Sequence, residues 1–249
     1  SAGHMQQAAD RLGEGPPESA GEAQQEAAAE MQRALDELDD ALRQVRREEV
    51  EQTLAALEAR FQAMLREERR IRDEVRLLAQ HASADWSRTD QQRLLDARQS
   101  QEKLVADGEV VLRILADEGT TVVLPDLVRG LLGDMSEVAA RLAASDVGVL
   151  TQSRLDDVIA LLEQIVGAIE TRRDAQSQQH GGEQGGPPDQ TPPLLPPSAE
   201  LKLLRGMQAR VNTRTEELAA GPPAPIREVE LLLLAERQRE IMRLAERVH

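Results

Sequence analysis

Cysteine and tyrosine are absent from this chain of 249 residues, and its only aromatic side chains are Phe61 and Trp86. Without cysteine, the chain forms no disulfide, no thiolate metal site and no cysteine nucleophile. A compact enzyme core of this length normally fills its volume with more aromatic side chains, whereas narrow seams of Leu, Val, Ile and Ala need few. The shortage of aromatics therefore favours helix packing over a large globular core.

Positive charge is also in short supply, with 30 Lys and Arg against 45 Asp and Glu and a formal net charge of −15. That balance repels the phosphates of nucleic acids and disfavours an anionic membrane surface. No apolar run approaches the roughly 20 residues that cross a bilayer as a helix. The sequence predicts no nucleic-acid partner and no direct membrane insertion.

Proline and glycine are missing between Glu22 and Ala82, which predicts one helix about 90 Å long at roughly 1.5 Å per residue. The apolar residues of this stretch are three or four positions apart, as in the seam of a coiled coil. They are Met31, Leu35, Leu38, Leu42, Val45, Val50, Leu54, Leu57, Phe61, Met64, Ile71, Val75 and Leu78.

The seam slips once, because Val45 and Val50 are five residues apart where four would continue it. A slip of one residue rotates the apolar stripe by about 100° around a helix. We expect the two halves of the long helix to face different partners, or the helix to bend. A local accommodation within a single seam is the alternative.

Five shorter helices are predicted after the long one. They cover about 89–117, 125–144, 151–174, 198–220 and 226–248. Thr89 with Gln92 resembles a capping box, and Pro125 suits a first helical turn. Gly130 and Gly133 lie three apart and would permit close approach of a neighbouring helix. The predicted fold class is all-α: an elongated helical bundle or antiparallel coiled coil built on the long helix, plus a C-terminal helical hairpin.

Four segments follow from these patterns. Residues 1–21 combine SAGHM, which is typical of an expression scar, with a small, polar stretch that we expect to be disordered. Residues 22–174 hold the long helix and the bundle. Residues 175–197 are rich in Gly and Pro and are expected to be a linker, whose PPLLPP has a polyproline ligand as its alternative reading.

Residues 198–249 form the hairpin, which we expect to dock on the N-terminal half of the long helix. Without such a cover, the apolar stripe at residues 31–45 would face water. A second copy of the chain and an external partner are the alternative covers. The docking residues expected are Leu204, Val211, Leu218, Val229, Leu233 and Ile241.

Catalytic motifs are hard to find. No phosphate-binding loop or GxSxG occurs, and the single ExxH, Glu246 to His249, has no mate for a two-metal site. Two of the histidines outside the scar, His180 and His249, lie in the linker and at the last position. The sequence predicts no catalytic residue, no cofactor and no metal ion.

Two stretches are candidate partner-binding surfaces. Arg210 and Arg214, with Asn212 between them, lie one helical turn apart and would grip a carboxylate; a solvated polar face is the alternative. Leu231, Leu232, Leu233 and Leu234 cover every side of a helix, so some of them should face an apolar surface beyond the hairpin itself. Burial within the chain is the alternative.

The stretches LKLLRGMQARVNTRTEEL and LLLLAERQREIMRLAERV resemble the C-terminal hairpin of uncharacterised exported coiled-coil proteins of bacteria. Some of these resemble accessory proteins of energy-transducing proton channels of the ExbB/TolQ type. The resemblance covers about 50 residues and implies an interaction protein of the envelope, with no catalytic residue. Residues 6–30 also resemble the start of a mature exported protein, so a periplasmic location is slightly favoured over a cytoplasmic one.

The function expected is that of a non-enzymatic helical scaffold or adaptor that presents helix faces to a protein partner. A compact ligand-binding protein or hydrolase with a pocket in residues 22–174 is one alternative. A purely structural homodimeric coiled coil is the other.

Overall fold

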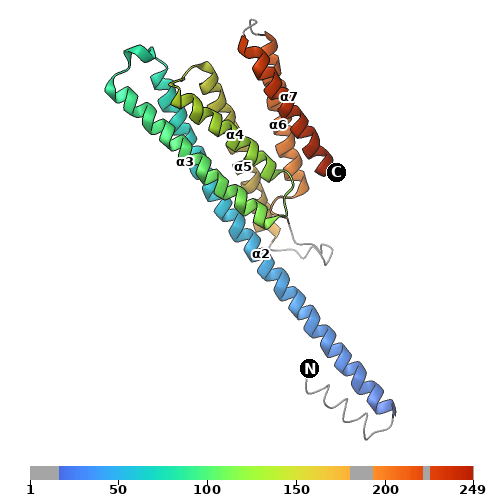
Figure 1. Ribbon diagram of the computed structural model, residues 1–249. Helices are drawn as coiled ribbons and strands as arrows, with labels where there is room; N and C mark the ends of the chain where they lie inside the picture. Colours follow the sequence, from blue (N-terminus) through green and yellow to red (C-terminus); the bar gives the residue numbers. More distant parts are fainter. Residues whose placement is uncertain (1–16, 180–192, 221–224, 249) are drawn as a thin grey trace. The chain divides into compact units, whose positions relative to one another are not determined.

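The structure, a computed structural model, describes residues 17–179, 193–220 and 225–248 (Figure 1). These residues form six α-helices and one short 3-10 turn, with no strand among them, which confirms the all-α prediction. The elements are α2 (Pro17–Leu78), η1 (Ser83–Asp85), α3 (Arg88–Glu118), α4 (Leu124–Ala143), α5 (Val149–Gln179), α6 (Pro197–Ala220) and α7 (Pro225–Val248). The chain divides into an N-terminal unit, Ser1–Glu51, and a bundle unit, Gln52–His249.

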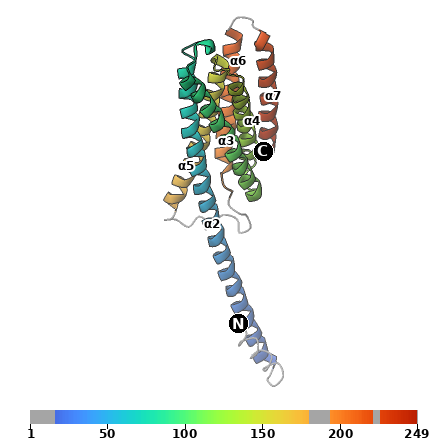
Figure 2. The same cartoon turned by 60° about the vertical axis from the view of Figure 1, so that its left-hand side comes forward.

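The core of the bundle unit lies between the C-terminal part of α2 and helices α3, α4 and α5, which run alongside one another (Figures 1 and 2). Each helix contributes aliphatic residues three and four positions apart, because that spacing puts them on one face. The largest fully buried side chains are Leu54, Leu57, Phe61, Ile71, Leu78, Leu115, Leu124, Leu127, Leu131, Met135, Leu142 and Leu155.

The slip in the seam of α2 coincides with a change in burial. Val45, before the slip, is 53% exposed, whereas Val50, after it, is 4% exposed. Leu54, Leu57 and Phe61 continue the buried series. The apolar residues before the slip are therefore exposed and those after it are buried, whereas the rotation of the stripe stays a prediction.

Several predicted helix ends were wrong by a few residues. Helix α2 begins at Pro17 and not at 22, which is sterically allowed because the first turn of a helix needs no amide donor. Helix α3 begins with a capping box formed by Ser87 and Asp90. The predicted capping box, Thr89 with Gln92, lies two residues further along the chain. Ser and Thr are both favoured N-cap residues, so the start of α3 was compatible with either register.

The segment predicted as a linker, residues 175–197, is structured at both ends. Helix α5 continues to Gln179, beyond the expected end near Asp174. Leu194 and Leu195 are fully buried, and the amide of Leu194 donates to Thr120 Oγ1 at 3.0 Å. The leucines of PPLLPP thus anchor the chain to the loop between α3 and α4; residues 180–192 lie outside the described part.

Glu200 of α6 joins the hairpin to the same loop. Its Oε1 accepts the amides of Val122 (2.9 Å) and Val123 (3.0 Å), at the start of α4. A carboxylate there satisfies amides that have no partner within the helix and complements the helix dipole. Because these two residues are about 78 positions from Glu200, the contact could not be predicted from local sequence spacing.

Helix α6 packs against α5 and α7, and ion pairs such as Arg237 with Asp134 join α7 to α4. The hairpin buries Leu203, Leu204, Met207, Val211, Ile241 and Leu244. Docking on the N-terminal half of the long helix was expected instead. The apolar face of the hairpin is instead buried within the bundle unit. Leu194, Leu195 and Glu200 hold the start of α6 beside α4. Of the expected docking residues, Leu233 is 40% exposed, and the side chain of Val229 lies outside the described residues.

Glu200→Ala is expected to lower the free energy of unfolding by about 2–3 kcal/mol, since it leaves two amides of the loop without their charged acceptor. Glu200→Gln keeps an acceptor oxygen and should cost less. Urea unfolding measures both, with the exposed Glu216→Ala as the control. Amide exchange at Val122 and Val123 should accelerate in Glu200→Ala; unchanged exchange there would contradict the cap.

Glycines on two helices have opposite surroundings. A Cβ on Gly133 of α4 would meet nothing within 4 Å, whereas one on Gly108 of α3 would overlap Leu132. A Cβ on Gly130 would meet only the tip of Arg237. The expected helix–helix close approach at Gly130 and Gly133 is therefore wrong, and Gly108 is where it occurs.

Gly133→Ala should raise the free energy of unfolding by about 0.5–1 kcal/mol, because Ala in a helix interior loses less backbone entropy than Gly. Gly108→Ala should lower it by about 1–3 kcal/mol through overpacking against Leu132. Thermal and urea unfolding of the two variants provide the comparison. Equal effects of the same sign would show that Gly108 is not at a close helix contact.

Candidate interaction surfaces

A stripe of large apolar side chains is exposed on the N-terminal unit. Five residues of α2, each 44–59% exposed, recur at three- and four-residue spacing: Met31, Leu35, Leu38, Leu42 and Val45. We call them the α2 stripe. Residues so spaced share one face of a helix, and leaving each in water costs about 1.5–3 kcal/mol relative to full burial.

The edges of the α2 stripe are mainly small or internally satisfied. Alanine follows one edge at seven-residue intervals, at Ala27, Ala34 and Ala41. On the other edge, Gln32 donates to Asp36 at 3.0 Å, and Arg46 donates to Glu49 at 3.4 Å, both within α2. The polar neighbours of the stripe thus use their hydrogen-bonding groups along their own helix.

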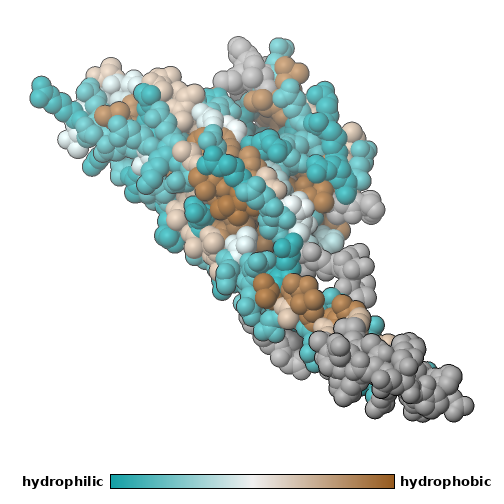
Figure 3. Space-filling view, turned by 60° about the horizontal axis from the view of Figure 1, so that its bottom comes forward, coloured by the Kyte–Doolittle hydropathy of each residue, from teal (hydrophilic) through white to brown (hydrophobic). Residues whose placement is uncertain are grey.

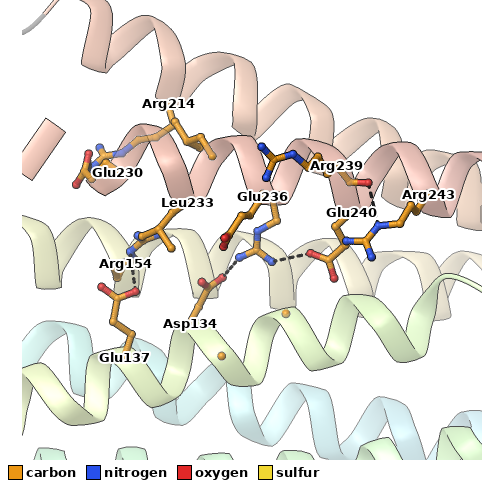
Figure 4. A pocket seen from close by; sticks show the side chains of 14 residues that line it. Asp134, Glu137, Arg154, Arg214, Glu230, Leu233, Glu236, Arg239, Glu240 and Arg243 are labelled. Atoms are coloured by element: carbon orange, nitrogen blue, oxygen red, sulfur yellow. Dashed lines mark hydrogen bonds and ion pairs between the residues drawn. The ribbon is translucent and has the colours of Figure 1, made fainter. Parts of the chain in front are cut away.

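A groove of about 670 Å³ separates α7 from α4 in the bundle unit, with Arg154 of α5 and Arg214 of α6 contributing to its walls (Figure 4). Five arginines and five carboxylates line it. Arg237 reaches across the groove to Asp134 of α4, and Arg154 lies 3.5 Å from Glu137. Arg214 pairs with Glu230 at 3.1 Å within the hairpin.

The paired charges decide what this groove is suited to bind. Each of Arg154, Arg214 and Arg237 already faces a carboxylate, so the groove offers neither a cluster of cations nor one of anions. Ligand pockets are usually apolar with a few polar groups, and this groove has the opposite balance. The groove is better described as an ionic seam between the hairpin and α4.

Beside the groove, Asp157 of α5 is half-buried. Burial raises the pKa of its carboxyl above the ordinary value, and the nearby positive charges of Arg154, Arg214 and Arg210 oppose that rise. Among the described residues, no group of three or more His, Asp or Glu has an arrangement that would hold a metal ion. The perturbed carboxyl thus lies among arginines and not within a ligand set.

Arg210 and Arg214 do not grip a common carboxylate. Arg210 donates to Gln164 Oε1 at 2.7 Å and to the backbone oxygen of Asp157 at 3.2 Å, both on α5. Arg214 binds Glu230 of α7. Arg210 therefore joins α6 to α5 and Arg214 joins α6 to α7, because residues four apart on α6 point to different neighbours here. Asn212 accepts from Gln208 and is exposed.

The four leucines of α7 point to different sides, as expected for consecutive residues on a helix. Leu233 lines the ionic groove, and Leu231 lines a second hollow of about 420 Å³ between α6 and α7. Leu234 lines both, and Leu232 is 66% exposed. Figure 3 shows apolar patches among hydrophilic surface on one face of the molecule. Their role in partner binding stays a prediction.

Two polar contacts escaped the sequence analysis. Arg237 and Asp134 are 103 residues apart, and each looks like an ordinary surface residue of its own helix. Glu68 and Gln101 are fully buried, and Gln101 Nε2 donates to Glu68 Oε1 at 2.7 Å. Only the second pair had a signal in the sequence that was not used: Glu68 occupies the seam position between Met64 and Ile71.

Nowhere in the described part of the chain is a helix both long enough and apolar enough to span a membrane. Comparison with known proteins found no matching family model, no matching curated protein and no matching solved structure.

Proposed function

We propose that this protein is a non-enzymatic helical adaptor that binds a protein partner through the α2 stripe. The observation that carries the proposal is the stripe itself, five large apolar side chains on one face of α2, each about half exposed. A contiguous apolar face of this kind is typical of a surface that another protein covers. Amphipathic helices bind other helices or grooves through anchors at this spacing.

The bundle unit supplies the second part of the adaptor. Its core is filled with aliphatic side chains, and the groove beside α7 is lined with ion pairs, so its chemistry supports a scaffold rather than a reaction site. The exposed leucines of α7 add a second surface for contacts. We assign the bacterial envelope as the setting on the resemblance of the C-terminal hairpin alone.

Affinity capture tests the adaptor role. The immobilised full chain is expected to retain a defined protein from a lysate of the source organism, and the double variant Leu35→Glu/Leu42→Glu is expected to lose it. Leu95→Glu, which changes an exposed leucine of α3, is the matched control and should retain it. Identical sets of retained proteins for the wild type and the double variant would contradict the proposal.

A further inference from the structure

The α2 stripe forms a short, regular seam. Numbered as a heptad and extended by Ala28, it has Ala28, Leu35 and Leu42 at its first core positions and Met31, Leu38 and Val45 at its second core positions. These six residues span about 27 Å of helix. The next core position in this register is Glu49, whose charge ends the seam. A partner helix therefore has six apolar layers to match and no more.

The flanks of that seam carry little information for choosing a foreign partner. Coiled-coil partners are selected mainly by charged residues beside the core. Here one flank is Ala27, Ala34 and Ala41, and the other is Gln32, Asp39 and Arg46. Gln32 is already hydrogen-bonded to Asp36 of its own helix. Only Asp39 and Arg46 among these six positions are charged, and Arg46 is already hydrogen-bonded to Glu49 of its own helix, so the flanks offer few charges for selecting an oppositely charged helix.

A second copy of the same stripe fits these features. It presents six apolar core residues at the same spacing, so each layer meets an apolar layer. Its own alanines are small enough to let two helices approach closely along the flank. It also ends its seam at the same charged residue. A self-complementary surface pairs through a two-fold axis, which closes the assembly at two chains.

We propose that the α2 stripe is the dimer interface of this protein, with a second copy of the chain as its occupant. This inference rests on the proposed adaptor function and names the partner of the same surface. Six layers make a small interface, and interfaces below roughly 1,200 Å² belong to the weak, reversible class. The dimer therefore forms and dissociates with concentration, and its Kd is of the order of micromolar.

Sedimentation equilibrium of the purified full chain over a wide range of concentration tests the dimer. The wild type should change from one chain to two with rising concentration. Leu38→Glu places two carboxylates in the central layers and should weaken the dimer at least about 100-fold. Leu95→Glu, an exposed leucine on α3, should leave the Kd unchanged.

Circular dichroism of Leu38→Glu checks that its helices persist, and Leu42→Glu gives a second, independent reading. A wild type that stays a single chain well above the expected Kd overturns the inference, as does a Leu38→Glu dimer as tight as the wild type. The adaptor function fails separately. If the wild type is a monomer and still captures a foreign protein through the stripe, the adaptor function stands and the dimer inference is rejected. If it is a monomer and captures nothing through the stripe, both proposals are rejected.

Discussion

Val75→Asp is expected to lower the free energy of unfolding by about 3 kcal/mol or more, which is a large part of the 5–15 kcal/mol of a typical domain. Val75 is fully buried in the bundle unit, on the face of α2 that follows the slip. An aspartate there is a charge without a partner among aliphatic side chains. Ile159→Asp, on α5, should have a similar effect because Ile159 is also buried.

Leu77→Asp is the matched control for this experiment. Leu77 is two residues from Val75 on the same helix but 47% exposed, so its replacement should cost only about 1 kcal/mol, from partial loss of burial and a negative charge in the last turn of α2. Urea unfolding followed by circular dichroism compares the three variants. If Val75→Asp melts like Leu77→Asp, the face of α2 assigned to the core is wrong.

Glu68→Gln is expected to make the protein less sensitive to pH. Burial of Glu68 among α2 and α3 raises the pKa of its carboxyl from 4.5 to about 7, and the hydrogen bond from Gln101 opposes part of that rise. The folded chain therefore keeps the proton to a higher pH than the unfolded chain does. Where the unfolded state ionises and the folded state does not, rising pH favours unfolding.

The pH window follows from those two pKa values. Below about pH 4.5 Glu68 is protonated in both states and does not lower the stability. Between about pH 4.5 and 7 the unfolded state ionises first, so the free energy of unfolding falls as the pH rises. Above about pH 7 this loss of stability is complete. The shift corresponds to roughly 3 kcal/mol. The stability of Glu68→Gln relative to the wild type should therefore rise by about that amount between pH 4.5 and pH 8.

Urea unfolding at several pH values measures this difference. Asp117→Asn, an exposed carboxylate of α3, serves as the control and should track the wild type. The subtraction matters because the chain carries a formal net charge of −15, and general charge repulsion also changes stability with pH. A Glu68→Gln curve parallel to that of the wild type would contradict a protonated Glu68 in the fold.

The spacing of apolar residues was sufficient to predict most of the fold. It predicted all six helices and the buried faces of α4 and α5, because a 3.6-residue period leaves the core on one side. It also located the apolar stripe before Val45, which was expected to be covered by the hairpin and is exposed. Charge pairs within one helix, such as Arg98 with Glu102, follow from the same geometry.

Contacts between distant segments escaped prediction for a physical reason. Leu194 and Leu195 sit among prolines, where composition indicates a linker, yet burial of two leucines holds the segment against the bundle. Glu200 looks like any acidic residue in a first helical turn until the loop of α4 lies beside it. Arg210 likewise looks solvated until Gln164 and Asp157 approach from α5. The spacing of residues along one helix does not determine such contacts between distant segments.

The hairpin shows the same limit at the level of domains. Its length and apolar faces matched the exposed stripe, but they matched α5 equally well, and only the anchors at Leu194 and Glu200 decide between the two surfaces. The apolar residues of the α2 stripe were therefore identified correctly, but the hairpin does not cover them.

Photo-crosslinking at Leu38 inside the source cell tests the central claim most directly. Benzoylphenylalanine in place of Leu38 puts a reactive ketone in the middle of the α2 stripe, and the same substitution at the exposed Leu77 is the control. If the stripe is an interaction surface, irradiation yields a covalent adduct of defined mass from position 38 and none from position 77. No adduct from position 38, or equal adducts from both positions, would contradict the claim.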